Sequence, residues 1–162
     1  MSKIRGLLAE TLHDTHSLAI LGCGSALLGD DAAGMQTAER LQALGGNVRV
    51  FCGSTAPENF TGEIKSFRPD ALLVIDAAEL AKPPGTVALI PPDKINGATF
   101  STHMLPLSIM LDYLRSEINC RVCILGIQGR SFEFGAPLTT EVNDAVDDIV
   151  SALISLFSPA SD

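Results

Sequence analysis

The chain has 162 residues, of which 46% are hydrophobic and 19% charged, and its formal net charge is −8. This length and composition predict one folded domain, residues 1–162, with a sizeable buried core. The negative charge argues against general binding to nucleic acid or to an anionic membrane surface, because both need a basic protein face.

No membrane span or secretory signal is expected. No apolar run reaches the roughly 18 residues that a membrane span needs. Residues 1–14 lack a cleavage signal and show the spacing of an amphipathic helix. We therefore expect a cytoplasmic protein without membrane insertion, whose four cysteines are reduced thiols. Cys120 and Cys123 have the spacing of half a zinc site, but they lie in a strand pattern that directs positions i and i+3 to opposite faces, so a structural role is expected.

Apolar runs alternate with helical patterns along the rest of the chain. Strands are predicted for residues 17–24, 47–52, 71–77, 86–90 and 121–128. Helices are predicted for residues 30–44 (ended by Gly45 and Gly46), for a short segment within 58–69, for 104–118 with Pro106 in the first turn, and for 139–157, capped by Thr139 or Thr140. This alternation is typical of a three-layer α/β sandwich, with a mostly parallel five-stranded sheet and helices on both faces. The short connection between the third and fourth strands allows one antiparallel strand.

Functional residues are expected where the strands end, because the sites of such folds lie at the carboxyl ends of the strands. The first strand runs into residues 29–31 (GDD), the second into Cys52 and the third ends at Asp76. Gly53 and Ser54, which follow Cys52, are candidate substrate-binding residues.

Gly24 and Gly29 have the spacing of a phosphate-binding loop, but the residues after them have the wrong charge. Such a loop continues with Lys and then Ser or Thr, where this chain has Asp30 and Asp31. Carboxylates at a helix N-terminus occupy the N–H groups that would bind phosphate, and they repel the anion. The dinucleotide fingerprint also fails, because Leu27 stands in place of its third glycine. No nucleotide is expected; Asp30 is predicted to cap the helix, and Asp31 to face a cation or hold a proton.

Asp76 and His103 are the other candidate functional residues. Asp76 ends an apolar strand and needs a partner if it is buried, and His103 lies in a polar loop just before a helix. With Asp31 they form a set of two carboxylates and one imidazole, which suits a borderline divalent metal such as zinc, nickel, manganese or iron. Structural roles are the alternative: Asp76 can cap a turn, and His103 can be a solvated loop side chain. A nucleophilic pair of Cys52 and His103 is a further possibility, against which Cys52 can be a small apolar side chain at a strand end.

These motifs resemble those of the nickel–iron hydrogenase maturation endopeptidases. The segment GSALLGDDAAG (residues 24–34) resembles the family's Gly-Asn-x-x-x-Gly-Asp-Asp/Glu-Gly-x-Gly opening. Residues 53–80 and 101–114 look most like the branch that serves the formate-hydrogenlyase-type hydrogenase. The resemblance covers nearly the whole chain and implies a twisted sheet between helices, of the phosphorylase/hydrolase-like kind. It implies an endopeptidase, usually classed as aspartic-type, that removes a short C-terminal tail from the hydrogenase large-subunit precursor after nickel has entered it.

The resemblance also implies roles for individual residues. By the family's motif, Asp31, Asp76 and His103 are the ligands that sense the nickel carried by the precursor, and they are candidates for a direct catalytic role. Two positions depart from the motif: Ser25 replaces an Asn, and Cys52 replaces an Asp that usually ends the second strand. The change at Cys52 supports an alternative function, a non-catalytic nickel-sensing assembly chaperone. A self-contained metallohydrolase of small peptides is another.

Overall fold

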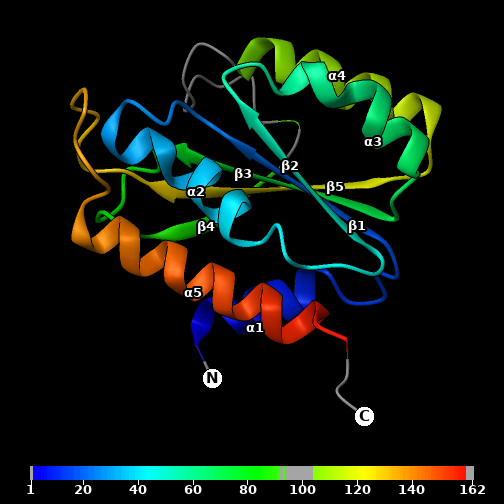
Figure 1. Cartoon of the computed structure of the whole chain (residues 1–162), viewed down its shortest axis with the longest axis horizontal. Coiled ribbons are helices and arrows are strands. Elements are labelled where there is room, and N and C mark those ends of the chain that lie inside the picture. The colour runs from blue at the N-terminus through cyan, green and yellow to red at the C-terminus, as the bar shows by residue number, and fades with distance from the viewer. Residues whose placement is uncertain (1, 92, 94–103, 160–162) are drawn as a thin grey trace.

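A computed structural model describes residues 2–91, 93 and 104–159 and contains a five-stranded sheet between two layers of helices (Figure 1). The strands are β1 (Leu18–Cys23), β2 (Val48–Ser54), β3 (Ala71–Ala78), β4 (Val87–Ile90) and β5 (Arg121–Gln128). Their order in the sheet is β2-β1-β3-β5-β4. β4 pairs antiparallel with β5, and the other neighbours pair in parallel. The predicted mostly parallel sheet, with one antiparallel strand after the short connection, is confirmed.

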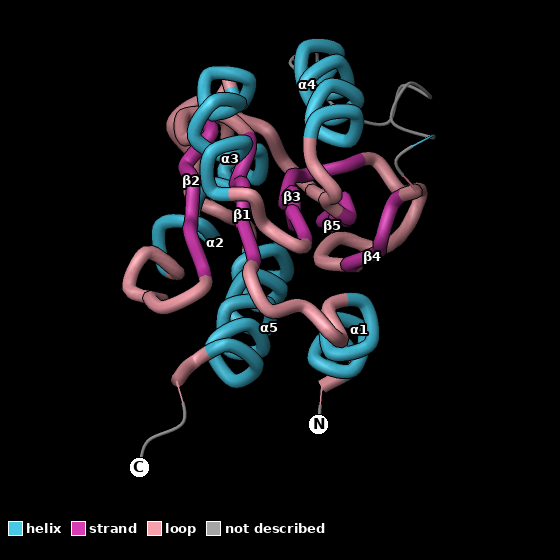
Figure 2. The backbone as a smooth tube through the Cα atoms, turned by 90° about the vertical axis from the view of Figure 1, so that its right-hand side faces the viewer, coloured by secondary structure: helices cyan, strands magenta, loops and turns pink. Residues whose placement is uncertain are grey.

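Helices cover both faces of this sheet (Figure 2). They are α1 (Lys3–Thr11), α2 (Ala33–Arg40), α3 (Thr61–Phe67), α4 (Met104–Glu117) and α5 (Thr140–Phe157), with short 3-10 helices η1 (Gly29–Ala32) and η2 (Pro57–Phe60) before α2 and α3. α1, α2 and α5 pack on one face, and α3 and α4 pack on the other. The predicted three-layer sandwich is therefore confirmed, and we call these two sides the α5 face and the α4 face.

The second predicted helix is shorter than expected. It starts as η1, continues as α2 and ends at Arg40 rather than at the glycine pair Gly45-Gly46. Two tight turns follow, in which the N–H of Leu41 bonds the carbonyl of Ala38 and the N–H of Leu44 bonds the carbonyl of Leu41, both at 3.0 Å. The helix therefore ends immediately before Leu41, whose side chain is buried in the core.

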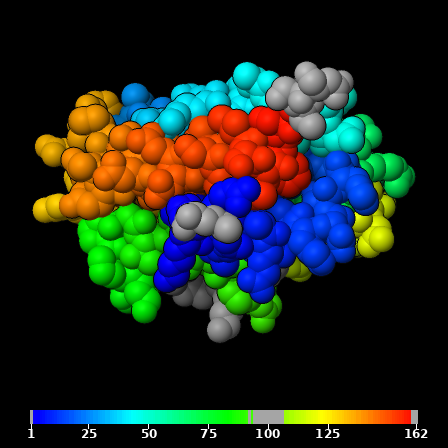
Figure 3. All heavy atoms as spheres, turned by 90° about the horizontal axis from the view of Figure 1, so that it is seen from below, coloured from blue at the N-terminus to red at the C-terminus, as the bar shows by residue number. Residues whose placement is uncertain are grey.

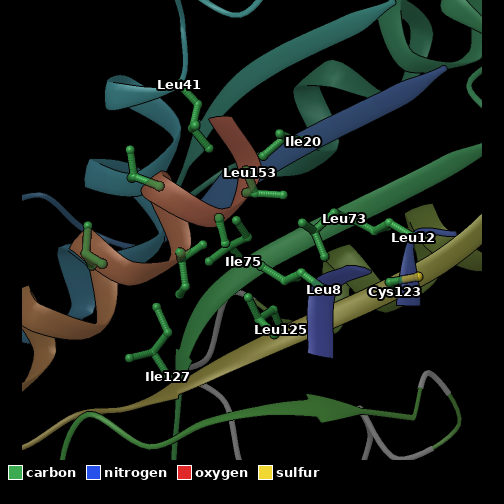
Figure 4. Packing of buried hydrophobic residues seen from close by; sticks show 14 of the residues in the cluster. Leu8, Leu12, Ile20, Leu41, Leu73, Ile75, Cys123, Leu125, Ile127 and Leu153 are labelled. Atoms are coloured by element: carbon green, nitrogen blue, oxygen red, sulfur yellow. The ribbon is translucent and has the colours of Figure 1, made fainter. Parts of the chain in front are cut away.

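β3 lies at the centre of the sheet and is buried along its whole length. Its side chains alternate between the two faces. Leu73 and Ile75 pack on the α5 face (Figure 4). Leu72 and Val74 pack on the α4 face. Each buried side chain of this size contributes about 1.5–3 kcal/mol to stability. The same alternation directs Asp76, the polar residue near the end of the strand, to the α4 face.

On the α5 face, the first and last helices of the chain lie side by side (Figure 3). Leu8 and Leu12 from the N-terminal segment join Val146, Ile149 and Leu153 of α5 in one core cluster. The amphipathic pattern predicted for residues 1–14 is thus confirmed.

The four cysteines are free thiols. Cys123 packs in the core on the α5 face, whereas Cys120 packs against the core on the α4 face. The prediction that this pair points to opposite faces is confirmed, and the two sulfurs do not form half of a zinc site. Within the described ranges, no helix is long and apolar enough to cross a membrane.

Candidate functional site

The carboxyl ends of β1, β2 and β3 meet at one edge of the sheet, because the three strands are parallel neighbours. The chain leaves β1 through Gly24, whose φ of +123° lies in a region that residues with side chains rarely adopt. A Cβ at this position would overlap the carbonyl oxygen of Asp31. The N–H of Gly24 donates to the carbonyl of Ser54 at 2.9 Å, which ties the end of β2 to this turn. Glycine therefore allows the loop that carries Asp31 to fold back against the strand ends.

The carboxylates of Asp31 and Asp76 flank the Gly24–Ser25 peptide. Oδ2 of Asp31 accepts a hydrogen bond from the N–H of Ser25 at 2.7 Å. Oδ1 of Asp76 lies 3.5 Å from the position that a Cβ of Gly24 would take. Asp31 is 7% exposed and Asp76 is fully buried. Two of the three acids and bases singled out in the sequence are therefore neighbours, although they come from different parts of the chain.

His103, the third of these residues, lies outside the described residues. α4 begins at the next residue, Met104, and packs on the α4 face, to which Asp76 also points. In the part of the chain that the structure describes, no three His, Cys, Asp or Glu side chains form a group that could hold a metal ion. The metal set of Asp31, Asp76 and His103 stays a prediction.

Asp30 does not cap the helix that follows it, contrary to the prediction. Neither η1 nor α2 has a side-chain cap. The carboxylate instead reaches the connection between β5 and α5, where Oδ2 accepts the N–H of Arg130 at 2.8 Å and of Ser131 at 3.0 Å. Oδ1 accepts the N–H of Thr139 at 2.8 Å, and the Thr139 hydroxyl donates to Oδ2 at 2.8 Å. The physical reason is that a buried carboxylate next to these N–H groups is more fully hydrogen-bonded there than at its own helix.

Thr139 occupies the N-cap position of α5, as predicted, but its hydroxyl bonds Asp30 rather than a helix N–H. Burial of Asp30 opposes its ionisation, and the hydrogen bonds from Thr139, Arg130 and Ser131 outweigh that effect. The pKa of Asp30 therefore lies below its ordinary value. Asp30 is an ionised structural acid that holds the loop before Asp31 in place.

Sequence analysis missed two residues beside these acids, Cys23 and Glu58. Cys23 ends β1 and is fully buried on the α4 face. Burial raises the pKa of its thiol well above the ordinary value, and the charges of Asp76, Glu58 and Asp31 raise it further. Cys23 is therefore a neutral thiol close to three carboxylates. Both residues could have been found from their positions in the sequence, because functional residues are expected near the carboxyl ends of strands. Cys23 ends β1, and Glu58 lies in η2, shortly after the end of β2.

Cys52 points away from the two aspartates. Phe51, its neighbour in β2, packs on the α4 face, so Cys52 projects to the α5 face. There its Sγ accepts a hydrogen bond from Nε2 of Gln42 at 3.1 Å. Cys52 and Asp76 thus project from opposite faces of the sheet, and the residue that departs from the family's motif has a structural contact. Gly53 is buried, and Ser54 is half-buried with a φ of +53°.

Comparisons with known proteins identify the family. The family model described as HycI, hydrogenase maturation protease, matches residues 35–156. The hydrogenase 3 maturation protease of Escherichia coli K12 is 37% identical to this chain over 136 residues, which cover 83% of this chain and 86% of the relative.

Two solved structures are similar to the whole fold. The crystal structure of a NiFe hydrogenase maturation protease HycI from Thermococcus kodakarensis KOD1 has a TM-score of 0.85 at 25% identity and covers 93% of this chain and 98% of that chain. The solution structure of an endopeptidase HycI from Escherichia coli has a TM-score of 0.75 at 33% identity and covers 90% of this chain and 97% of that chain. This chain belongs to the hydrogenase maturation protease family and is a peptidase.

Proposed function

We propose that the protein is an endopeptidase that removes the C-terminal tail of a nickel-loaded NiFe-hydrogenase large-subunit precursor. The names of the similar proteins support the reaction class, since they are hydrogenase maturation proteases. The observation that carries the proposal is the meeting of Asp31 and Asp76 at the Gly24–Ser25 peptide, at the edge of the sheet where such folds bind ligands.

Asp31, Asp76 and His103 are the residues that would contact the precursor's nickel. Oδ2 of Asp31 is held by the N–H of Ser25. Oδ1 of Asp31 forms no hydrogen bond with the residues described, which leaves it available to a cation. Asp76 is fixed by β3, where it pairs in register with Gly126 of β5. Two carboxylates, one at a strand end and one in a short loop, together with an imidazole, form a suitable ligand set for a divalent ion. Such an ion must reach the site with unoccupied coordination positions.

Hydrolysis requires water to attack the scissile carbonyl carbon and a proton to reach the departing amine. Nickel held by Asp31, Asp76 and His103 would polarise the carbonyl, and the carboxylate of Asp31 or Asp76 would take the proton from the attacking water. A C–O bond forms, the C–N bond breaks, and the proton passes to the amine of the released tail. Gly53 and Ser54, at the end of β2, are proposed to contact the substrate chain.

The test is to mix the protein with precursor prepared with and without nickel and to follow tail loss by mass spectrometry. We expect tail loss only with nickel-loaded precursor. Cleavage that ignores nickel would contradict the sensing role of the three residues. Binding of the loaded precursor without tail loss would favour the assembly chaperone, and cleavage of small model peptides would favour the self-contained metallohydrolase.

A further inference from the structure

Four of the seven large hydrophobic side chains that are exposed in the described part of the chain lie in two loops. Leu27 and Leu28 are in the loop between β1 and η1, and Phe132 and Phe134 are in the connection between β5 and α5. Phe134 is 75% exposed and Leu27 is 60% exposed. We call these four residues the apolar patch. Single exposed apolar side chains are common on protein surfaces, whereas a contiguous group of them marks an interaction site.

Backbone contacts bring the two loops together. Leu28 and Phe134 form an isolated antiparallel β-bridge, and the N–H of Gly135 donates to the carbonyl of Leu27 at 2.8 Å. Residues directly opposite each other in an antiparallel pair project to the same side, with Cβ atoms about 4.5–5.5 Å apart. The side chains of Leu28 and Phe134 are therefore neighbours, and the apolar patch joins two loops that are distant in sequence.

Hydrogen bonds also fix the two loops to each other beside the patch. The N–H of Asp30 donates to the carbonyl of Ser131 at 2.8 Å, and the Asp30 carboxylate accepts the N–H groups of Arg130 and Ser131. Gly29 has a φ of +52°, and a Cβ there would lie 2.6 Å from the Ser131 carbonyl oxygen, so the loops approach closely. The apolar side chains are thus presented on a backbone that is already ordered, and a partner does not incur the entropic cost of ordering it.

The apolar patch adjoins Asp31 of the candidate site. The N–H of Asp31 donates to the carbonyl of Leu28 at 3.0 Å, and its Oδ2 accepts the N–H of Ser25. The N–H of Leu27 in turn donates to the Ser25 hydroxyl at 3.2 Å. Figure 1 shows the β5–α5 connection, in orange, at the end of the sheet where β3 and β5 finish. A polypeptide segment that docks at Asp31 therefore has the apolar patch beside it.

We propose that the apolar patch binds an extended apolar segment of the substrate polypeptide, next to the bond that is cleaved. Large apolar side chains of that segment would cover Phe134 and the two leucines and remove them from water. The proposal rests on the proposed function, because it takes a precursor polypeptide to dock at Asp31. It extends that function by assigning the binding of the peptide to a surface separate from the metal ligands.

A second copy of this chain is a less suitable occupant of the apolar patch. In a symmetric dimer the same surface meets itself. Glu133, between the two phenylalanines, is exposed, so two of these carboxylates would come together as the patches are buried. The net charge of −8 adds repulsion between copies. A precursor segment that is apolar and free of acidic residues avoids the repulsion at Glu133.

The first measurement is the affinity of the nickel-loaded precursor for the wild type, Phe134→Ser and Phe134→Leu. Loss of a large aromatic contact costs much of the affinity of an interface, so we expect the dissociation constant of Phe134→Ser to rise about tenfold or more. Phe134→Leu keeps an apolar side chain and should keep most of the affinity. Leu27→Ser, in the other loop, should weaken binding as well. Ile154→Ser removes an exposed isoleucine of α5 outside the patch and is the matched control, which should bind as the wild type does.

The kinetics of tail removal separate docking from chemistry. For Phe134→Ser we expect a higher KM and an unchanged kcat, because the patch holds the substrate without touching the reacting atoms. A lower kcat with an unchanged KM would contradict the docking role. Circular dichroism and thermal melting check that each variant is folded.

The partner of the patch is then located by changing the apolar residues near the cleaved bond of the precursor to Ser, one at a time. The precursor variant that lacks the contact should bind the wild type and Phe134→Ser equally well. The inference is overturned if Phe134→Ser and Leu27→Ser bind the precursor like the wild type, and tail removal by the wild type would then leave the proposed function intact. Binding without tail removal that still depends on Phe134 would support the patch and contradict the peptidase reaction on this substrate. Self-association of the wild type that Phe134→Ser abolishes, without a change in precursor affinity, would overturn the inference and assign the patch to a second copy.

Discussion

Oδ1 of Asp30 accepts a hydrogen bond from the N–H of Thr139 at 2.8 Å, although the two residues are 109 positions apart in the chain. The contact joins the loop after β1 to the start of α5. Asp31, the neighbour of Asp30, lies in that same loop and is held by the N–H of Ser25 at 2.7 Å. The first acid of the pair therefore positions the second.

Replacement of Asp30 by Asn should destabilise the protein. The amide cannot accept hydrogen bonds from Arg130, Ser131 and Thr139 as the carboxylate does, so one or more of these N–H groups would lose its partner. We expect a loss of about 1.5–3 kcal/mol in the free energy of unfolding, measured by urea denaturation. Asp144→Asn, at an exposed position of α5, is the control and should unfold like the wild type. An unchanged midpoint for Asp30→Asn would contradict the structural role.

The same carboxylate predicts an acid-dependent loss of stability. Because the pKa of Asp30 is lowered by folding from its ordinary value of 3.8, its contribution is present above that pH and is lost as the pH falls through the lower, folded value. The wild type should therefore lose more stability between pH 5 and acidic conditions below about pH 4 than Asp30→Asn does. Thermal melts across this range measure the difference, and parallel curves for the two proteins would be the contrary result.

Asp31→Asn and Asp76→Asn should remove activity without unfolding the protein. Both changes keep the size of the side chain but remove a negative charge from the buried surroundings of Cys23. We expect tail removal to fall about 10²–10⁴-fold, as for loss of an acid–base group. Circular dichroism checks that each variant is folded. Full activity in either variant, measured by mass spectrometry of the precursor, would exclude that aspartate from the reaction.

Gly24→Ala should damage both the fold and the site. The left-handed backbone strains any residue with a side chain, by about 1–3 kcal/mol, and the new Cβ would overlap the Asp31 carbonyl oxygen. Gly62→Ala is the control, because a Cβ there has open space inside α3 and should stabilise the helix by about 0.5–1 kcal/mol. Denaturation of the two variants gives the comparison, and equal stability would refute the tight turn at Gly24.

The cysteines should differ in their reactivity toward a thiol-alkylating reagent. Burial, assisted by the charges of Cys123 and Asp70, raises the pKa of Cys120 to about 11, and Cys23 is fully buried. At pH 8 about one Cys120 thiol in a thousand is ionised, so modification of the native protein should begin at half-buried Cys52. Peptide mapping identifies the modified residue.

Cys52→Ala should retain tail removal. Its sulfur bonds Gln42 on the α5 face, whereas Asp76 projects to the α4 face. Loss of activity in this variant, with normal folding, would revive the interpretation of Cys52 as a nucleophile.

The sequence by itself determined the architecture and the approximate place of the site. The spacing of apolar residues located the strands and helices. Apolar residues recur at the helical period where one face of a helix is buried, and a strand buried on both faces is apolar along its whole length. The same periodicity correctly placed Cys120 and Cys123 on opposite faces of the sheet. The early end of α2 at Arg40 was not predicted. The helix was expected to continue to the glycine pair Gly45-Gly46, but it ends just before the buried side chain of Leu41.

Only the tertiary structure separated Asp30 from Asp31. The two residues are adjacent in one short helical turn. The local pattern predicted that Asp30 caps its own helix, whereas its carboxylate bonds residues 130–139. The outcome depends on where residues 130–139 lie, and that depends on how α5 packs on the sheet. Glu58 joined the site for the same reason, and His103 stays a prediction. A local pattern encodes which side chains are buried, but the partner of a buried polar group is supplied by segments distant in sequence, so packing decides it.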